Sequence, residues 1–244
     1  MTVRVLINGA FGRMGQMISK IMSEDARFEL VGETGREYNL GKAIQDSDAQ
    51  VVIDFTHPDA VFNNSLAIIA AGARPVIGTT GLKADQVQIL KDKCAEKKLG
   101  GIIAPNFSLG AVLMMKYAKE IAKYMPQAEI IEYHHENKVD SPSGTSLRTA
   151  EMIGEVIKEK YRESKTFRET IPGSRGAIHH GIPIHAVRLP GLLAHQEVIF
   201  GEAGETLTIR HDSIDRISFA PGICFACEKV ITLDQLVYGL EEIL

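Results

Sequence analysis

The densest group of chemically active side chains lies in the stretch EIIEYHHENKVDSPSGT, residues 129–145. His134 and His135 close an apolar run there, and Lys138 follows them. An imidazole accepts or donates a proton near neutral pH, and a lysine supplies positive charge or, where its pKa is lowered, a proton. Because side chains alternate along a strand, only one of the two histidines can face a given side. We therefore predict a proton-transfer site in which one histidine takes part in chemistry and the other makes a different contact.

The end of this stretch, Pro142-Ser143-Gly144-Thr145, directly precedes a segment with helical spacing of its apolar residues. Ser143 is a candidate N-cap, and the amides of a first helical turn favour an anion in front of them. Together with Lys138 these amides could hold a carboxylate or a phosphate. The competing interpretation, that the histidines are ordinary solvated or packed side chains, is weakened by the neighbouring lysine and helix start. The nearby carboxylates lack the spacing of a metal-ligand set, so no metal site is expected.

A glycine-rich turn, GAFGRMG at residues 9–15, follows the first strand-like run, VRVLI at residues 3–7. Glycines allow a sharp turn and let a pyrophosphate approach the N-terminus of the next helix, where amides and the helix dipole favour negative charge. The spacing GxxGxxG departs from the common GxGxxG pattern. Its place between a strand and a helix favours dinucleotide binding over the alternative, glycines that only permit close helix packing.

The cofactor that such a turn would bind is a nicotinamide dinucleotide, and the sequence supports both forms. Glu33 ends the second strand-like run, where a carboxylate could accept hydrogen bonds from the adenosine ribose of NADH. Arg13 and Arg36 lie where a guanidinium could instead clamp the 2′-phosphate of NADPH. The run GTTG at residues 78–81 follows the fourth strand-like run, and it is either a cofactor-facing loop or a plain turn.

The alternation of strand-like and helix-like segments over the first 105 residues predicts an α/β domain with a doubly wound parallel sheet. The expected strands are the apolar runs at 3–7, 26–34, 49–56, 73–81 and 99–108. After Asn106 the rhythm changes to long helices and partly alternating strands, which predicts a mixed or antiparallel sheet with helices on one face. Residues 162–181 lack an apolar period and are expected to form a long exposed loop.

The composition is that of a globular protein, with 244 residues, 45% hydrophobic, 24% charged and a net charge of −4. Interspersed charges of both signs give no electrostatic footprint for nucleic acid or an anionic membrane. The longest apolar runs, such as LAIIAAGA at 66–73, fall short of the roughly 20 residues that a membrane span needs. The start of the sequence also lacks a signal-peptide layout. We therefore expect a cytoplasmic protein with a small-molecule substrate and no nucleic-acid or membrane partner.

Cys224 and Cys227 form a CxxC, and Cys94 is the remaining cysteine of the sequence. Three cysteines are too few and too unevenly spaced for a secreted disulfide framework. A zinc site needs about four ligands, and the sequence has no second CxxC and no HxxxH pair. We interpret the pair as reduced, packed thiols on one side of a C-terminal helix.

Five segments, in this order and separation, carry a resemblance to one family: GAFGRMG, VIDFTHPDAV, GTTG, APNFSLG and EYHHENKVDSPSGT. Over essentially its whole length the sequence resembles the 4-hydroxy-tetrahydrodipicolinate reductases, or dihydrodipicolinate reductases, of lysine and diaminopimelate biosynthesis. The resemblance implies an NAD(P)H-dependent oxidoreductase. Residues 1–105 and 216–244 would form a Rossmann-like dinucleotide-binding domain. Residues 106–215 would form an α+β domain with a mixed sheet, which binds the cyclic dicarboxylate substrate and builds a homotetramer.

The resemblance also implies roles for individual residues. In the HHxxKxDxPSGT signature, His134 matches the acid/base residue and Lys138 the lysine that donates a proton or orients the substrate. The positions that match groups holding the substrate carboxylates are His135, Gly144 and Thr145. The positions that match cofactor contacts are Gly9, Gly12, Arg13, Met14 and Arg36, then Gly78, Thr79 and Thr80 near the nicotinamide, and Asn106 and Phe107 between the domains. Ser141 stands where the family more often has alanine.

The implied reaction is hydride transfer to carbon 4 of a conjugated cyclic imine, after loss of a hydroxyl as water, with a proton added at carbon 3. His134 or Lys138 would deliver that proton. Closure of the two domains would bring the nicotinamide and the imine together. Two other functions stay open: a dinucleotide-sensing protein without catalysis, and a nicotinamide-dependent dehydrogenase of amino-acid semialdehydes. The HHxxKxDxPSGT signature favours the reductase over both.

Overall fold

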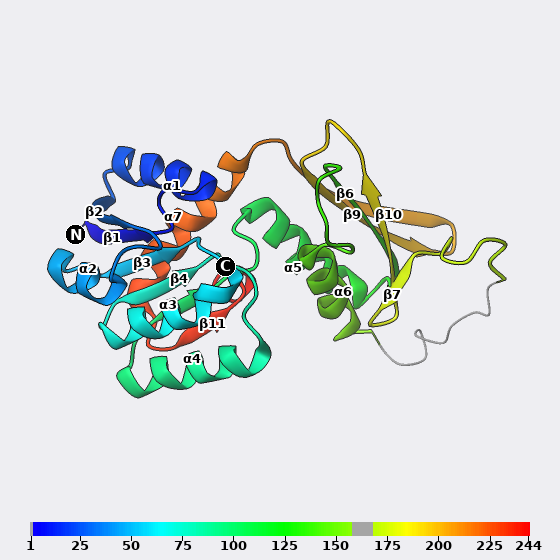
Figure 1. Ribbon diagram of the computed structural model, residues 1–244. Coiled ribbons are helices and arrows are strands. Elements are labelled where there is room, and N and C mark those ends of the chain that lie inside the picture. Colours follow the sequence, from blue (N-terminus) through cyan, green and yellow to red (C-terminus); the bar gives the residue numbers. More distant parts are fainter. Residues whose placement is uncertain (1, 158–167) are drawn as a thin grey trace. The chain divides into compact units, whose positions relative to one another are not determined.

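The computed structural model of the chain describes residues 2–157 and 168–244. The chain divides into two compact units, one comprising Met1–Phe107 with Phe219–Leu244 and the other Ser108–Ser218. We call the first the terminal unit, because it contains both ends of the chain, and the second the central unit (Figure 1).

Within its described residues, the terminal unit contains a six-stranded sheet of order β2-β1-β3-β4-β5-β11 whose neighbouring strands are all parallel. The strands are β1 (Val3–Asn8), β2 (Phe28–Thr34), β3 (Val51–Asp54), β4 (Arg74–Ile77), β5 (Gly101–Ile103) and β11 (Leu236–Tyr238). All residues of β3 are buried, as expected in a sheet covered on both faces. The predicted doubly wound parallel sheet is confirmed, and β11 is a further strand that the sequence did not predict.

Helices cover both faces of this sheet, with α1 and α7 on one side and α2, α3 and α4 on the other (Figure 1). Their bounds are α1 (Arg13–Glu24), α2 (Leu40–Ser47), α3 (Pro58–Ala70), α4 (Ala84–Lys97) and α7 (Ala220–Lys229). Short 3-10 helices lie at Arg216–Phe219, Val230–Thr232 and Leu240–Glu242. One layer of the core packs Leu6, Val52 and Ile77 of the sheet against Ile68 of α3 and Leu90 of α4. This rigid α/β sandwich holds the glycine-rich turn between β1 and α1.

The three cysteines are buried side chains. Cys224 and Cys227 lie on α7, and neither they nor Cys94 form a disulfide. Burial raises the pKa of Cys94 to about 11, and it also raises the pKa of Cys224 and Cys227. The thiols therefore stay protonated at neutral pH, in agreement with the prediction of reduced, packed cysteines.

The central unit, described over residues 108–157 and 168–218, contains a five-stranded mixed sheet of order β10-β9-β6-β8-β7. Its elements are α5 (Leu109–Ala122), β6 (Gln127–His134), α6 (Gly144–Gly154), β7 (Ala177–His179), β8 (Ile182–Arg188), β9 (Ala194–Glu202) and β10 (Glu205–Ser213). β6 runs parallel to β8, and the other neighbours are antiparallel. The predicted mixed sheet is confirmed.

Helices α5 and α6 form a common core with one face of the central sheet. This core contains Ala118, Ala122, Ala150 and Ile153 from the helices and Ile130, Ile184, Val198 and Phe200 from the strands. Along β6 the buried residues alternate with more exposed ones, so every second side chain from Ala128 onward points toward the helices. That alternation decides which polar side chains of β6 reach the helical layer.

The predicted loop over residues 162–181 is wrong at one end. Residues 162–167 lie outside the described residues. Ala177–His179, however, forms β7, which pairs antiparallel with β8. The strand has three residues, and both Ala177 and Ile178 are exposed, so it carries no apolar period that a sequence pattern could reveal.

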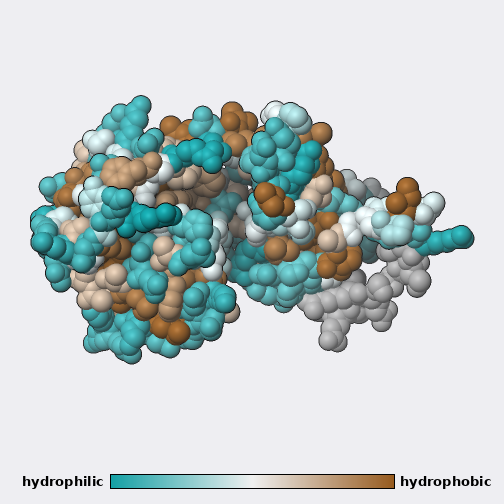
Figure 2. All heavy atoms as spheres, in the orientation of Figure 1, coloured by the Kyte–Doolittle hydropathy of each residue, from teal (hydrophilic) through white to brown (hydrophobic). Residues whose placement is uncertain are grey.

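On the face of the terminal unit that Figure 2 shows, hydrophilic residues predominate and hydrophobic ones are scattered among them. The large apolar side chains of this unit lie mainly inside, and Leu6, Ile53 and Leu90 are fully buried. Among the described residues, no helix is both long enough and apolar enough to cross a membrane.

A half-buried histidine links β10 to the start of α5. His211 Nε2 lies 3.0 Å from Ser108 Oγ, and a Cβ built on Gly110 would lie 2.7 Å from the ring. Burial lowers the pKa of His211 below its ordinary value of 6.5, although Asp212 acts in the opposite direction. The folded protein therefore binds this proton less readily than the unfolded chain. Its contribution to stability is complete above pH 6.5 and is lost as the pH falls toward the lower folded pKa.

We expect the urea midpoint of the wild type to fall more steeply than that of His211→Gln as the pH drops from about 7 to about 5. Glutamine can still hydrogen-bond Ser108 but does not titrate. The exposed histidine variant His57→Asn should follow the wild-type curve. Identical pH dependence of the wild type and His211→Gln would contradict a lowered pKa of His211 in the folded protein.

Candidate active site

The polar end of β6 continues the inward-facing row of the strand. Ala128 and Ile130 are buried in the helical layer, and Glu132 and His134 follow at the same spacing. Glu132 is completely buried, and the His134 side chain is 14% exposed. A carboxylate thus lies at a position where the pattern of the strand calls for an apolar side chain.

Glu132 is the centre of a hydrogen-bonded cluster. Arg188 donates to both of its oxygens, from Nη2 to Oε1 at 2.8 Å and from Nη1 to Oε2 at 2.9 Å. The backbone N–H of Ser143 donates to Oε1 at 3.2 Å, and His134 Nδ1 bonds Oε2. Arg188 reaches this place because β8 runs parallel to β6 with Arg188 directly beside His134. The carboxylate therefore joins the end of β6, the end of β8 and the start of α6.

The charge state of Glu132 fixes the tautomer of His134. Burial opposes ionisation of Glu132, but the hydrogen bonds from His134 and Arg188 outweigh it, and the pKa of this carboxyl is lowered. An ionised carboxylate only accepts hydrogen bonds, so His134 Nδ1 is the donor. In the neutral ring Nε2 then carries the lone pair, and it can accept a proton or, after protonation, donate one.

Lys138 and the helix start belong to the same cluster. Lys138 Nζ donates to both carboxylate oxygens of Asp140 at 2.7 Å, and Arg188 Nη2 donates to the backbone carbonyl of Asp140 at 2.8 Å. The hydrogen bond from Lys138 lowers the pKa of Asp140, so this carboxyl is ionised at neutral pH. His134, Lys138 and the first turn of α6 are close in the sequence. They are also connected in space through the hydrogen bonds of Arg188 and Glu132.

The first turn of α6 contains the predicted cap and two of the predicted substrate-binding residues. Ser143 is its N-cap and accepts a hydrogen bond from Ser146 N at 3.2 Å, which confirms the predicted cap. Gly144 and Thr145 are the first residues of the helix, and its first turn contains no acidic residue. A Cβ built on Gly144 would meet nothing within 4 Å, so protein packing does not require a glycine there. The assignment of Gly144 to a substrate carboxylate stays a prediction.

His134 is the last residue of β6 and His135 follows the strand, so strand alternation does not fix the direction of the His135 side chain. His135 is half-buried, and its carbonyl accepts from Lys138 N at 3.1 Å, which closes the turn after the strand. Its assignment to a substrate carboxylate stays a prediction.

In the terminal unit, the three glycines of the β1–α1 turn have different reasons to be glycine. Gly9 has φ +88°, and a Cβ there would lie 2.3 Å from the Phe55 carbonyl oxygen. A Cβ on Gly15 would lie 2.1 Å from the Gly9 carbonyl oxygen, so Gly15 allows close helix packing. On Gly12 it would meet only Gly9 O, at 3.5 Å, an ordinary contact. Protein packing therefore requires glycine at Gly9 and Gly15 but not at Gly12. The contact of Gly12 with a dinucleotide pyrophosphate stays a prediction.

Other features of this turn fit the same ligand. Within the described part of the chain, no side chain caps α1, and its first turn has no acidic residue. Arg13 is exposed and Met14 half-buried at that turn, while Glu33 and Arg36 are exposed near the end of β2. The strand order reverses at β1, between β2 and β3, which is where doubly wound sheets bind ligands.

A buried carboxylate that sequence reasoning missed organises the carboxyl edge of this sheet. Asp54, at the end of β3, is fully buried. It accepts hydrogen bonds from Asn8 Nδ2 at 2.8 Å, Asn64 Nδ2 at 3.0 Å and Thr79 Oγ1 at 2.5 Å. Because the Thr79 hydroxyl is engaged in this network, the exposed Thr80 is the threonine of the GTTG run whose side chain is open to a ligand.

Gly78 and Phe107 have structural reasons to lie near this edge. A Cβ on Gly78 would lie 2.1 Å from the Phe55 ring, and Phe55 packs on Phe107 with ring centroids 5.7 Å apart. The Phe107 side chain is 2% exposed and Asn106 is half-buried. Phe107 therefore supports the GTTG run through Phe55, and contact of Phe107 or Asn106 with a cofactor stays a prediction.

Comparison with known proteins decides the family. The family model described as dihydrodipicolinate reductase, N-terminus, matches residues 3–107, and the model described as dihydrodipicolinate reductase, C-terminus, matches residues 110–244. The chain belongs to the dihydrodipicolinate reductase family. It is therefore an oxidoreductase, with a Rossmann-like sheet in one unit and a mixed sheet in the other.

Full-length members of the family are similar to this chain throughout. The 4-hydroxy-tetrahydrodipicolinate reductase of Coxiella burnetii is 55% identical over 244 residues, and that of Legionella pneumophila is 52% identical, each with 100% of both chains covered. A solved structure of dihydrodipicolinate reductase from Paenisporosarcina sp. TG-14 with dipicolinate bound is 41% identical. It covers 100% of both chains with a TM-score of 0.91.

Proposed function

We propose that this chain reduces 4-hydroxy-tetrahydrodipicolinate to tetrahydrodipicolinate with NADH or NADPH, as a step of diaminopimelate and lysine biosynthesis. The observation that carries the proposal is the bonded cluster of His134, Glu132 and Arg188 beside the start of α6. It combines a proton donor with an anion site, which is what reduction of a cyclic imine dicarboxylate requires. A dinucleotide sensor without catalysis does not need a proton donor.

The substrate carboxylates would bind at the first turn of α6. The amides of Gly144 and Thr145 provide fixed donors, and the Lys138 ammonium provides a cation whose side chain is 20% exposed. The relative from Paenisporosarcina, which has dipicolinate bound, supports a planar or near-planar ring with two carboxylates as the ligand class. His135, which follows the end of β6, would contact the second carboxylate.

The 4-hydroxyl would first leave as water, which gives a conjugated cyclic imine, and the nicotinamide, when bound, would supply the hydride that adds to carbon 4 of this imine. The electron pair displaced toward carbon 3 then takes a proton, and we assign its delivery to His134 Nε2. Glu132 stabilises the protonated imidazole and, in the neutral ring, keeps the proton on Nδ1. Arg188 keeps Glu132 ionised, so the carboxylate does not take the proton itself. Lys138 orients the substrate or donates the proton in place of His134.

The terminal unit would hold the cofactor, with Gly9, Gly12, Arg13 and Met14 at the pyrophosphate. Glu33 would favour NADH through the ribose hydroxyls, and Arg13 with Arg36 would favour NADPH through the 2′-phosphate. Gly78, Thr79 and Thr80 would border the nicotinamide at the carboxyl edge of the sheet.

Gly12→Ala separates cofactor binding from folding. Its methyl group finds room in the protein, since the nearest atom is Gly9 O at 3.5 Å, so stability should change by less than about 1 kcal/mol. It would stand against the pyrophosphate, and we expect the Kd of the preferred cofactor to rise at least about tenfold. Titration by nicotinamide fluorescence measures this. An unchanged Kd in a folded Gly12→Ala protein would contradict binding of the pyrophosphate at this turn.

A coupled assay tests the proposed reaction. The substrate is generated in place from pyruvate and aspartate semialdehyde with the upstream synthase, and nicotinamide absorbance is followed with NADH and NADPH in separate reactions. We expect oxidation that depends on both the synthase and this protein, and the ratio of the two kcat/KM values gives the cofactor preference. Absence of oxidation with either cofactor, from folded protein that binds them, would contradict the proposal and favour the sensor or a semialdehyde dehydrogenase.

We also propose that the central unit builds a homotetramer. Ile178 on the edge strand β7 is 64% exposed and Leu207 on the opposite edge strand β10 is 41% exposed, and assembly would cover such side chains. Light scattering at assay concentrations should give about four times the chain mass of 26.7 kDa. A monomeric mass would contradict this assembly.

A further inference from the structure

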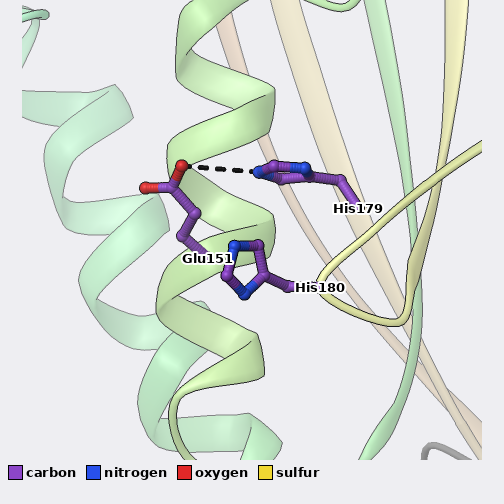
Figure 3. A group of neighbouring side chains, drawn as sticks. All are labelled: Glu151, His179 and His180. Atoms are coloured by element: carbon purple, nitrogen blue, oxygen red, sulfur yellow. Dashed lines mark hydrogen bonds and ion pairs between the residues drawn. The ribbon is translucent and has the colours of Figure 1, made fainter.

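Three potential metal ligands meet on the central unit away from the cluster around Glu132. They are Glu151 on α6, His179 at the end of β7, and His180 in the turn that follows (Figure 3). One ligand atom from each lies within 4.8 Å of the others. His179 Nε2 is 3.4 Å from Glu151 Oε1, and the two imidazole rings meet edge to face with centroids 4.6 Å apart.

The turn explains how two consecutive histidines reach one place. His179 pairs with Ile182, so His180 and Gly181 form a two-residue hairpin loop. Both have positive φ, 49° and 82°, as a type I′ turn requires. Consecutive side chains on a continued strand would point to opposite faces. The left-handed conformation of His180 instead brings its ring beside that of His179, and Figure 3 shows both rings close to Glu151 on α6.

The helix is shaped to receive this turn. Gly154 lies three residues after Glu151 and so on the same side of α6. A Cβ built on Gly154 would lie 2.8 Å from the His180 Cβ and 3.1 Å from the His180 carbonyl oxygen. A side chain at this position would push the turn away, so glycine is what allows His180 to lie against the helix beside Glu151.

We propose that Glu151, His179 and His180 bind a divalent transition-metal ion of the Zn²⁺ class. Two imidazole nitrogens and one carboxylate oxygen form a donor set that Zn²⁺ takes in proteins when its fourth position is left to water. Metal–ligand bonds of about 2.0–2.1 Å require the ligand atoms to lie about 3.4 Å apart in a tetrahedral site. The distance from His179 Nε2 to Glu151 Oε1 already has this value. The His180 ring is exposed, and rotation of its side chain would bring its ligand nitrogen from within 4.8 Å to the same distance.

The surroundings of Glu151 suit ligation by one oxygen. Oε1 faces His179, and Oε2 lies 3.6 Å from Arg148 Nη1. A metal ion would take Oε1 while Arg148 continues to orient the carboxylate through Oε2. Arg148 also contacts Glu155 at 3.8 Å, so its positive charge is shared between two carboxylates. An ion here would fasten the β7–β8 turn to α6 about two turns from Gly144.

The test uses the full-length wild-type protein after treatment with a chelator, with Co²⁺ or Zn²⁺ alone as the probe. Titration with Co²⁺ should give one saturable ion per chain with visible absorption bands of low-symmetry nitrogen and oxygen ligation. Zn²⁺ should displace it, and calorimetry gives its Kd. We expect Glu151→Gln and His179→Gln each to weaken Zn²⁺ binding by about 10- to 100-fold. At Zn²⁺ concentrations of about 100 times Kd, the Tm of the wild type should rise by about 5 °C, and that of His179→Gln should not.

His57→Asn is the matched control. His57 Nδ1 lies 3.3 Å from Asp59, so it forms an exposed histidine–carboxylate pair of similar spacing. Asparagine preserves its N-capping role on α3. This variant should bind Zn²⁺ like the wild type, and the buried thiols do not compete. If His179→Gln binds Zn²⁺ as tightly as the wild type, or if the wild type shows no saturable Co²⁺ or Zn²⁺ binding at up to about 1 mM, the proposal is wrong.

Discussion

Replacing His134 by glutamine should lower kcat by about 10²- to 10⁴-fold, while the Kd of the cofactor should stay within about twofold of the wild-type value. Glutamine can still donate a hydrogen bond to Glu132, so the cluster of Glu132 and Arg188 keeps its partner. It has no group that transfers a proton near neutral pH. The glycine-rich turn to which we assign cofactor binding lies in the terminal unit and His134 in the central unit, so the substitution should separate catalysis from cofactor binding.

His185→Gln provides the control. His185 lies on β8, directly beside Ile131 of β6, and its Nε2 is 2.8 Å from Glu129 Oε2. It is thus a histidine–carboxylate pair in the same sheet to which we assign no chemistry, and its loss should change kcat less than about threefold. Steady-state kinetics and cofactor titration of both variants measure the difference. Loss of cofactor binding in His134→Gln, or equal losses of kcat in the two variants, would contradict the assignment of His134.

Replacing Glu132 by glutamine should cost about 3 kcal/mol of unfolding free energy in the central unit and about tenfold in kcat. The variant leaves the Arg188 guanidinium, whose side chain is 19% exposed, without its charge partner. It also removes the anion that stabilises protonated His134. Urea unfolding and the pH dependence of kcat measure the two effects. Because Glu132 acts through His134, the conservative variant Glu132→Asp should recover part of kcat.

The acid dependence of stability follows from the same carboxylate. The pKa of Glu132 is lowered from 4.5, since hydrogen bonds from His134 and Arg188 outweigh the effect of burial. Its contribution to stability is therefore complete above about pH 4.5 and is lost as the pH falls through the lower folded pKa. Glu132→Gln should lack this loss. Glu197→Gln, which removes a carboxylate 3.3 Å from the more exposed Arg210, should cost less than about 1 kcal/mol. A cost for Glu132→Gln no larger than this would argue against a structural role of the buried pair.

Most of the terminal unit could be predicted because local sequence patterns indicate its strands, helices and turns. The strand β3 is a short apolar run, and the glycine-rich turn stands between a strand and a helix. The strand β11 could not be predicted, because its three residues become a strand only by pairing with β5, far away in the sequence. Similarly, β7 is recognised only by its pairing with β8. Elements defined by nonlocal hydrogen bonds carry little signal of their own.

The candidate site shows the same division. His134, Lys138 and Ser143 are neighbours in one stretch, so residue type and spacing were enough to propose a site there, and the Ser143 cap is confirmed. Arg188 lies 56 residues beyond Glu132 and arrives through the parallel pairing of β8 with β6, which no local pattern reveals. Glu132 did carry a signal, since it continues the inward phase of Ala128 and Ile130 as a carboxylate. Glu151 and His179 are 28 residues apart, and the turn at His180 brings them together. The sequence pattern alone therefore did not reveal this group.

The most direct test of the proposed reaction follows the hydride itself. Reduced nicotinamide carrying deuterium at its transferable position would be oxidised by the wild-type protein in the coupled reaction, and the product examined by NMR. The account predicts deuterium at carbon 4 of tetrahydrodipicolinate, with the hydrogen added at carbon 3 coming from solvent. Deuterium at another carbon, or a product without deuterium, would contradict hydride transfer to carbon 4 and the proton-donating role of His134 that depends on it.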